Sequence, residues 1–226
     1  MTGAPLLSIT SLRVEFERWG QTVTAVDGLD LVVPQGQWIM LKGHNGSGKS
    51  SLLSAIAGRV RIAAGSIKST LNASRDKGFA SECFFVTQDP LAATADALSL
   101  TENLKVADPA PAPAHRGALY DSLMKSVGLW PRRDQLLRYF SGGERQQIAL
   151  LVAEIRRPAL LLLDEPFSAL DPLRAASCME LLQSIHRQGT TILQVTHDEG
   201  MAHSFGDRTI SLERGVLRSD NLRGVQ

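Results

Sequence analysis

The sequence contains little cysteine, and its cysteines have no spacing that would suit a metal ion. Its 226 residues include two cysteines, Cys83 and Cys178, which are far apart and form no Cys-x-x-Cys pair. Zinc sites and disulfide frameworks need closely spaced sets of such residues. We therefore expect neither a zinc site nor a disulfide framework to stabilise the fold. Such sparse, unpaired cysteines are typical of a protein in a reducing compartment. A chain of this length buries roughly 70% of its unfolded surface without such cross-links.

Long apolar runs and an excess of one charge are also missing. The densest apolar runs, Ile148–Ala153 and Ala159–Leu163, have six and five residues, well short of the ~18 that span a bilayer. The net charge of +1, from 24 Lys+Arg against 23 Asp+Glu, argues against a nucleic-acid partner. The first residues, Met-Thr-Gly-Ala-Pro, do not resemble a signal peptide. We therefore expect a cytosolic chain whose membrane role, if it has one, depends on a partner.

The order of the expected elements predicts an α/β fold with a mixed, mainly parallel sheet. Near the start, Leu7–Phe16 and Thr22–Val33 alternate apolar and polar residues, which predicts an N-terminal antiparallel β subdomain. Farther along, short apolar strands such as Ala159–Leu163 and Thr190–Thr196 alternate with helices. That alternation is typical of a parallel sheet covered on both faces. A closing hairpin is expected at Arg208–Leu217.

Residues 89–140 have a different character and predict a small helical subdomain. Ser99 and Glu102 have the spacing of a capping box at a helix start, and Arg116–Gly128 has a helical pattern. Between them, Asp108–His115 alternates alanine and proline, which predicts a stiff extended linker. We interpret residues 1–226 as a single domain and 89–140 as an insertion in it.

A glycine-rich loop provides the first chemical signal. Gly43-x-x-x-x-Gly48-Lys49-Ser50 follows an expected strand and begins an expected helix, which is the context of a phosphate-binding P-loop. Glycines let backbone N–H groups turn toward phosphate oxygens, the helix N-terminus adds partial positive charge, the lysine reaches the phosphates and the serine can bind Mg²⁺. The expected nucleotide-binding residues here are Gly43, Asn45, Gly46, Ser47, Gly48, Lys49, Ser50 and Ser51.

Two consecutive carboxylates follow a second apolar strand. Leu160-Leu-Leu-Leu-Asp164-Glu165 has the pattern by which P-loop folds present a metal ligand at the carboxyl edge of the sheet. We expect Asp164 to bind Mg²⁺. We expect Glu165, whose side chain would point to the other face of the strand end, to orient or deprotonate the attacking water.

With these residues in place, the chain resembles the ATP-binding-cassette (ABC) ATPases. Ser141-Gly142-Gly143-Glu144-Arg145-Gln146 is similar to the signature motif of that family. In order along the chain, Gln88 matches the Q-loop, Ser168–Asp171 the D-loop and His197 the switch histidine. The resemblance covers Leu7 to Leu217 and implies a P-loop NTPase core with ATP and Mg²⁺ as cofactors. One departure is Phe140, where the family usually has leucine, and we expect little consequence from it.

The resemblance also implies roles for residues outside the P-loop. The signature residues Ser141, Gly142 and Gly143, with Asp171, would complete the ATP site of a second, identical subunit, so that a dimer encloses two ATP molecules. His197 would contact the γ-phosphate, and Gln88 would coordinate Mg²⁺ or water. An aromatic residue stacks on adenine in this family, for which Trp19 is the candidate and Phe16 the alternative. His115, His186 and His203 are expected to have no such role.

Two kinds of ABC ATPase remain in competition. The 52 residues between Gln88 and Ser141 leave no room for the coiled coil of a chromosome ATPase, and a single cassette argues against a translation factor. We therefore favour a transporter subunit at the cytoplasmic face of the inner membrane, held there by an integral membrane permease that contacts the segment from 89 to Glu102. It resembles uptake cassettes for amino-acid-like or aromatic solutes, with a solute-binding protein as a further partner. A lipoprotein-release or division-type cassette, or a soluble ABC ATPase, is the alternative.

Overall fold

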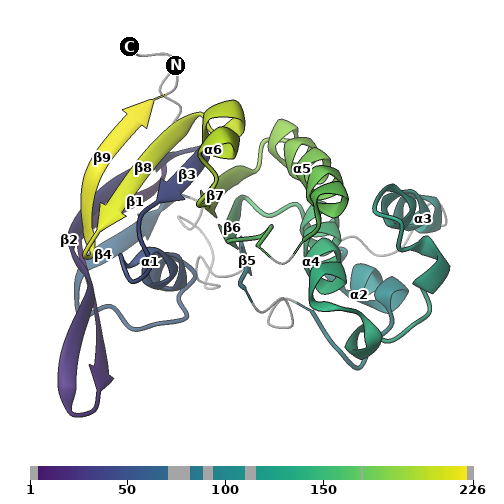
Figure 1. Ribbon diagram of the computed structural model, residues 1–226, viewed down its shortest axis with the longest axis horizontal. Helices are drawn as coiled ribbons and strands as arrows, with labels where there is room; N and C mark the ends of the chain where they lie inside the picture. The colour runs from purple at the N-terminus through teal and green to yellow at the C-terminus, as the bar shows by residue number, and fades with distance from the viewer. Residues whose placement is uncertain (1–4, 71–81, 89–93, 110–115, 169, 223–226) are drawn as a thin grey trace. The chain divides into compact units, whose positions relative to one another are not determined.

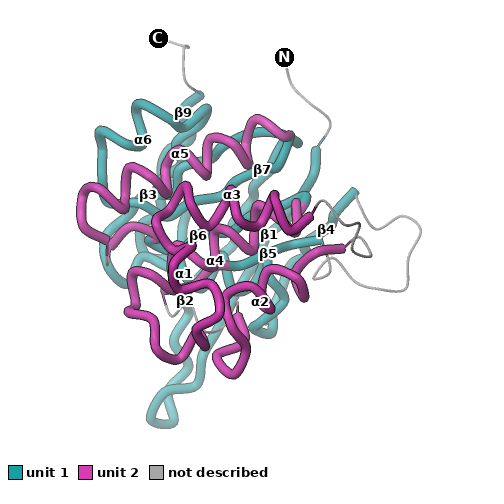
Figure 2. Tube along the Cα trace, turned by 90° about the vertical axis from the view of Figure 1, so that its right-hand side faces the viewer, with its two compact units in different colours: residues 1–85, 159–165, 189–226 teal, residues 86–158, 166–188 magenta. Residues whose placement is uncertain are grey.

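The computed structural model describes residues 5–70, 82–88, 94–109, 116–168 and 170–222. The chain forms two compact units, which Figure 2 colours separately. Unit 1 comprises residues 1–85, 159–165 and 189–226, and unit 2 comprises residues 86–158 and 166–188. The interpretation of 1–226 as one domain with an insertion at 89–140 stays a prediction. Residues 89–93 of the expected permease contact and 110–115 of the expected linker lie outside the described residues.

Unit 1 contains a three-stranded antiparallel sheet near the N-terminus (Figure 1). Its strands are β1 (Pro5–Arg18), β2 (Gln21–Pro34) and β4 (Ala64–Ser69), in the order β2-β1-β4. The first two confirm the expected antiparallel pair, because alternate side chains along them are buried. Sequence analysis missed β4, whose residues Ala-Gly-Ser-Ile-Lys-Ser include no buried side chain.

The second sheet of unit 1 is mixed and mainly parallel, as predicted. It has the order β5-β6-β7-β3-β8-β9. Strands β6, β7, β3 and β8 run parallel, and β9 closes the sheet antiparallel to β8. The bounds are β3 (Trp38–Lys42), β5 (Cys83–Val86), β6 (Leu160–Asp164), β7 (Thr191–Val195), β8 (Arg208–Glu213) and β9 (Val216–Leu222). Every residue of β6 and β7 is buried, which explains their continuous apolar sequence.

Helix α1 (Lys49–Ile56) belongs to the same core as both sheets. Leu52, Leu53 and Ile56 on this helix cluster with buried residues of β1, β2, β3 and β6. Burying these side chains anchors the helix, whose N-terminus continues directly from the glycine-rich loop. The short helix α6 (Glu199–Phe205), capped by Asp198, was not expected from the sequence.

Unit 2 is helical. It consists of α2 (Leu100–Ala107), α3 (Arg116–Ser126), the 3₁₀ turns η4 (Trp130–Arg132) and η5 (Leu137–Tyr139), α4 (Gly142–Arg156) and α5 (Pro172–Arg187). Helix α4 packs against α2 and α5. The predicted capping box at Ser99 is confirmed. Ser141 forms the same kind of box with Glu144 at the start of α4, and Asp171 caps α5 ahead of Pro172.

A buried polar cluster holds the first helices of unit 2. The Asp108 side chain, 2% exposed, pairs with Arg116 and accepts a hydrogen bond from the Tyr120 hydroxyl at 2.6 Å. Burial, together with the neighbouring carboxylate, raises the pKa of Tyr120 to about 12. Tyr120 therefore stays protonated at neutral pH and remains a donor to Asp108. Over the described residues, the helices are too short or too polar to cross a membrane.

Candidate functional site

Three strands of the parallel sheet end at the same edge. The residues of unit 1 with expected chemical roles come after the ends of these strands. Asp164 at the end of β6 pairs with Val195 of β7, which pairs in turn with Leu41 of β3. Parallel strands aligned in this way bring their carboxyl ends to the same edge of the sheet. The glycine-rich loop, Glu165 and His197 therefore start from one edge within unit 1.

The glycine-rich loop has a backbone that side chains would disrupt. Gly43 has φ +145°, and a Cβ there would lie 2.4 Å from the Leu212 carbonyl oxygen. Gly48 has φ +102°, and its Cβ would lie 2.2 Å from the Ala25 carbonyl oxygen. Only glycine fits both the dihedral angles and the space. The loop is therefore a close-packed cradle, as a phosphate site requires.

Hydrogen bonds hold the Lys49 side chain against this loop. Its side chain is buried, and Nζ donates to the carbonyl oxygens of Gly43 at 2.8 Å and His44 at 3.0 Å. Burial lowers the pKa of the Lys49 ammonium, while the carboxylates of Glu165 and Asp164 oppose that shift. The ammonium group is thus held by carbonyl oxygens of the loop, where it can meet the charge of a phosphate.

Asp164 has the properties of a metal ligand. The residue is buried, and its Oδ1 has no hydrogen-bond partner among the described residues. Burial raises the pKa of this carboxyl, and a hydrogen bond from the exposed Ser50 and the charge of Lys49 act against the rise. An unsatisfied buried oxygen is costly unless a ligand uses it. Asp164 and Ser50 together offer hard oxygen donors of the kind that Mg²⁺ prefers.

Glu165 and His197 lie side by side. The Glu165 Oε1 and His197 Nε2 atoms are 2.9 Å apart. Glu165 directly follows β6 and has φ +52°, a left-handed conformation that is rare for a residue with a side chain. Because the strand has ended, the alternation of strand side chains does not determine where Glu165 points. The turn directs it toward His197.

Sequence analysis missed the backbone that supports the loop. Gly215, in the β8–β9 turn, donates its N–H to the Ser47 carbonyl at 2.9 Å and accepts from Asp27 N at 3.0 Å. Ala25 of β2 closes over Gly48. Gly215 lies within the hairpin expected at Arg208–Leu217, but its contact with the loop joins segments more than 160 residues apart. Such a contact has no local sequence signal.

Five expected site residues belong to unit 2. Ser141, Gly142 and Gly143 lie at the start of α4, with Ser141 as the N-cap. Asp171 is the exposed N-cap of α5 and accepts from Leu173 N at 3.1 Å and Arg174 N at 3.0 Å. Gln88 is exposed just after β5. Their roles toward a nucleotide stay predictions.

Trp19 lies at the turn between β1 and β2 and is fully exposed, with φ +54°. A fully exposed indole offers a flat apolar face on which a ligand ring can stack. Phe16, the alternative, is partly buried against the core of unit 1. This contrast favours Trp19 as the residue available to a ligand. The structure assigns Trp38 to the core, where its indole Nε1 donates to Gln194 at 3.0 Å.

Comparisons with known proteins show the family to which the chain is similar. A model of the ABC transporter family matches residues 26–168, more than half of the chain. An aliphatic sulfonates import ATP-binding protein of Agrobacterium fabrum is 39% identical over 192 residues, which cover 84% of this chain and 71% of that protein. A tyrosine transport ATP-binding protein of Clostridioides difficile is 30% identical, over 95% of this chain and 91% of that protein.

The fold is likewise similar to that of a solved ATP-binding subunit of an ABC transporter. The TM-score is 0.82 at 25% identity, over 96% of this chain and 90% of that one. The names of these relatives confirm the resemblance to uptake cassettes and do not favour the soluble or lipoprotein-release alternatives. The P-loop fold, the length of the match and the identity to these ATP-binding subunits together place this chain in the ABC transporter family, as one of its ATP-hydrolysing cassettes.

Proposed function

We propose that this chain drives the uptake of a small organic solute by hydrolysing Mg-ATP on behalf of a membrane permease. The observation that carries the proposal is the pair formed by Glu165 and His197, 2.9 Å apart at the sheet edge that also begins the Lys49 loop. A carboxylate held by a histidine beside a phosphate cradle has the parts needed to activate water against a γ-phosphate.

Each expected site residue has a definite task in this proposal. Lys49 and the loop N–H groups bind the β- and γ-phosphates, and Ser50 and Asp164 hold Mg²⁺. Mg²⁺, when bound, neutralises charge on the phosphate oxygens. Glu165 accepts the proton of the attacking water, and His197 keeps the carboxylate oriented toward it. Gln88 would act as a further ligand of the metal or of the water.

The working form in this proposal is a homodimer. One chain has one lysine cradle, at the start of α1, whereas α4 begins with two consecutive glycines and has no such lysine. The N-terminus of α4 can bind an anion through its N–H groups, and within a dimer it would close over the ATP held by the other copy. Ser141, Gly142, Gly143 and Asp171 would supply these contacts.

The names of two relatives support a solute class. One is named for aliphatic sulfonates and the other for tyrosine, both small organic molecules with an anionic group. We propose a solute of this kind, delivered by a solute-binding protein to a permease that holds the cassette at the inner face of the membrane. The permease would contact the segment that leads to Glu102, so charge reversals there should abolish transport and spare basal ATP hydrolysis.

Substitution Glu165→Gln tests the core of the proposal. The amide keeps the size of the side chain but cannot accept the proton, so kcat should fall by about 10²–10⁴-fold. ATP should still bind, and the variant should form a stable dimer in sedimentation experiments with ATP. Hydrolysis at the wild-type rate would reject Glu165 as the base. A purified variant that stays monomeric with saturating ATP would reject the dimer.

The role of Trp19 has its own test. If its ring stacks on adenine, Trp19→Ala should raise KM for ATP about threefold to tenfold, the size of one aromatic contact, with kcat unchanged. Phe16→Leu is the matched control, because Phe16 packs against the core. A rise in KM with the control and none with Trp19→Ala would transfer the assignment to Phe16.

A further inference from the structure

A carboxylate lies in the first turn of α4, at the helix start that the proposed function brings to ATP. Glu144 Oε2 accepts hydrogen bonds from Ser141 N at 2.8 Å and Ser141 Oγ at 3.1 Å, and Glu144 N donates to Ser141 Oγ at 3.3 Å. This capping box stabilises the helix. The same negative charge, however, would repel the phosphates of a nucleotide that approaches Ser141. The site therefore needs something that offsets Glu144.

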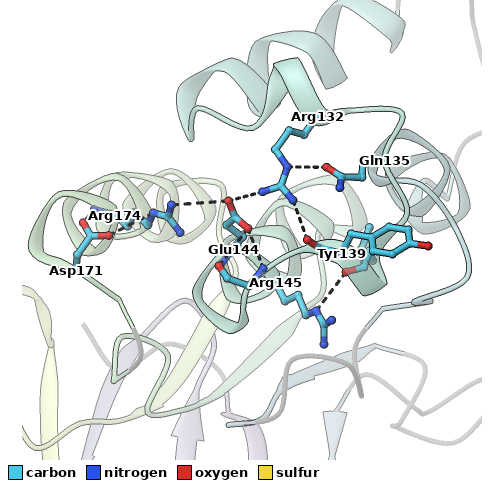
Figure 3. A network of polar contacts seen from close by, with 9 residues as sticks. Arg132, Gln135, Tyr139, Glu144, Arg145, Asp171 and Arg174 are labelled. Atoms are coloured by element: carbon cyan, nitrogen blue, oxygen red, sulfur yellow. Dashed lines mark hydrogen bonds and ion pairs between the residues drawn. The ribbon is translucent and has the colours of Figure 1, made fainter.

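Arg132 provides the opposite charge. Its Nη1 lies 2.6 Å from Glu144 Oε1, whereas Arg174, on α5, lies 3.8 Å from the same oxygen. The Glu144 side chain is only 12% exposed, so solvent screens the Arg132 pair less than it would a surface pair. Figure 3 shows Arg132 bridging toward Glu144 and the segment that precedes it. Arg132 is thus the principal charge partner of the cap.

Other contacts hold the Arg132 guanidinium in place. Its Nε donates to Gln135 Oε1 at 2.7 Å, and its Nη2 donates to the Tyr139 carbonyl at 2.9 Å (Figure 3). The guanidinium carbon also lies 4.1 Å from the centre of the Phe140 ring. Tyr139 and Phe140 immediately precede Ser141, so one side chain contacts both the entry to the helix and the carboxylate within it. The aromatic ring at 140, a departure from the family's usual leucine, allows this cation–π contact.

Glu144 does not lose its negative charge by protonation. Burial raises the pKa of its carboxyl, but the hydrogen bonds from Ser141 and Arg132 outweigh burial and leave the pKa below its ordinary value. The group is therefore ionised at neutral pH. Its effect on a phosphate must be cancelled by a neighbouring cation.

We propose that Arg132 is a positioning residue for ATP binding, which cancels the charge of Glu144 so that the capped N-terminus of α4 can receive a phosphate. This inference rests on the proposed function, because it requires α4 to meet ATP. It assigns Arg132 no contact with the nucleotide. Arg132 affects the site through its contacts with Glu144 and with the backbone that precedes Ser141.

The test uses the full-length chain with Glu165→Gln, in which ATP would hold the dimer without turnover. The ATP concentration that gives half-maximal dimer is measured by sedimentation in 0.1 M salt, where exposed charges are largely screened beyond about 10 Å. Arg132→Ala should raise this concentration about tenfold, the effect of an uncompensated charge close to the phosphates. Arg133→Ala is the matched control, because it removes the same charge one residue away from a side chain of similar exposure. It should shift the midpoint less than about twofold, as expected for an exposed pair.

A second substitution separates charge from packing. Glu144→Gln keeps the capping box without the negative charge. If the proposal holds, Arg132→Ala combined with Glu144→Gln should dimerise at nearly the ATP concentration of Glu144→Gln alone. A tenfold defect that persists in the combined variant would overturn the proposal and assign Arg132 to packing through Gln135, Tyr139 and Phe140. An unchanged midpoint with Arg132→Ala would overturn it as well.

Folding and the proposed function are controlled separately. Arg132→Gln, which keeps polar contacts but removes the charge, replaces Arg132→Ala if thermal unfolding shows that the alanine variant is not folded. It should give the same defect and the same rescue by Glu144→Gln. A Glu165→Gln parent that does not dimerise with ATP would reject the proposed function and this inference together. A parent that dimerises while Arg132 variants behave like it rejects this inference alone.

Discussion

The N-termini of α1 and α4 both include glycine in or beside their first turn, but their backbone donors are used in different ways. At α1 the N-cap is Gly48, which has no side chain, and the following residue is the buried Lys49. At α4 the N-cap is Ser141, which forms a closed capping box with Glu144. The first helix start presents free N–H groups and a cation. The second has already satisfied part of its donors with a serine and a carboxylate.

This difference separates a site that is complete by itself from one that needs support. The α1 loop is held in shape by close contacts with Leu212 and Ala25 and by the Lys49 hydrogen bonds, so its geometry exists before a phosphate arrives. The start of α4 is also rigid, but its carboxylate opposes an anion. A capped helix therefore becomes an anion site only where a neighbouring cation offsets the cap, which is the task assigned to Arg132.

The largest expected effect is at the α1 end. Lys49→Ala removes the only cation in that turn and two hydrogen bonds that shape the loop. ATP hydrolysis should fall by about 10²–10³-fold, the loss of one well-placed charged donor, as measured by phosphate release. Lys42→Ala is the control, since Lys42 pairs only loosely with Glu199 at 3.9 Å and should change the rate by less than about twofold. Equal losses in the two variants would remove the distinction between the helix starts.

Asp164→Asn should have opposite effects on activity and stability. Loss of the charged metal ligand should lower Mg-dependent hydrolysis about a hundredfold. Without nucleotide, the variant should be more stable by about 1 kcal/mol, because a neutral amide replaces a buried carboxylate whose Oδ1 has no partner among the described residues. Chemical unfolding measures this difference.

The pH dependence of the Asp164→Asn comparison has a definite sign. The pKa of Asp164 is raised in the folded protein by burial, so the folded state binds this proton more tightly than the unfolded state does. Above the pKa of Asp164 in the folded protein, ionised Asp164 destabilises the folded state. This destabilisation disappears as pH falls from the folded pKa to the lower pKa of the unfolded chain. The stability gain should therefore shrink as pH is lowered. A gain that grew at low pH would contradict the assignment.

Gly48→Ala tests whether the α1 cradle depends on close packing. The new Cβ would meet the Ala25 carbonyl at 2.2 Å with φ at +102°, so the loop must shift, at a cost of about 2–3 kcal/mol. Gly46→Ala is the matched control, because φ is also positive there but nothing lies within 4 Å of the added atom. That variant should lose about 1 kcal/mol. Thermal unfolding and ATP binding should both show a larger loss for Gly48→Ala than for Gly46→Ala. Equal losses of stability in the two variants would contradict the packing argument.

The smallest effects compare two capping boxes. Ser141→Ala and Ser99→Ala each remove a serine N-cap that bonds a glutamate three residues later, which should cost about 1 kcal/mol of unfolding free energy in either case. Only Ser141→Ala should also weaken the ATP-dependent dimer. If Ser99→Ala weakened the dimer equally, the effect of both caps would be one of stability alone.

Local patterns in the sequence were sufficient for much of the fold. Alternation of side chains predicted β1 and β2, apolar runs predicted β6 and β7, and the serine–glutamate spacing predicted the start of α2. These features depend on residues a few positions apart, whose geometry is nearly independent of the rest of the chain. Strand β4 was missed because Ala-Gly-Ser-Ile-Lys-Ser has little strand pattern of its own and becomes a strand by pairing with β1.

The amino-acid sequence by itself determined the phosphate loop, the carboxylates after β6 and the capped start of α4, since each is a short run with its own chemistry. Only the tertiary structure decided which of these groups meet. It placed Glu165 against His197, closed Ala25 and Gly215 over the loop, and paired Arg132 with Glu144. The physical reason is that these contacts join segments whose separation along the chain leaves no periodic or motif-like trace, so they exist only once the core has brought the segments together.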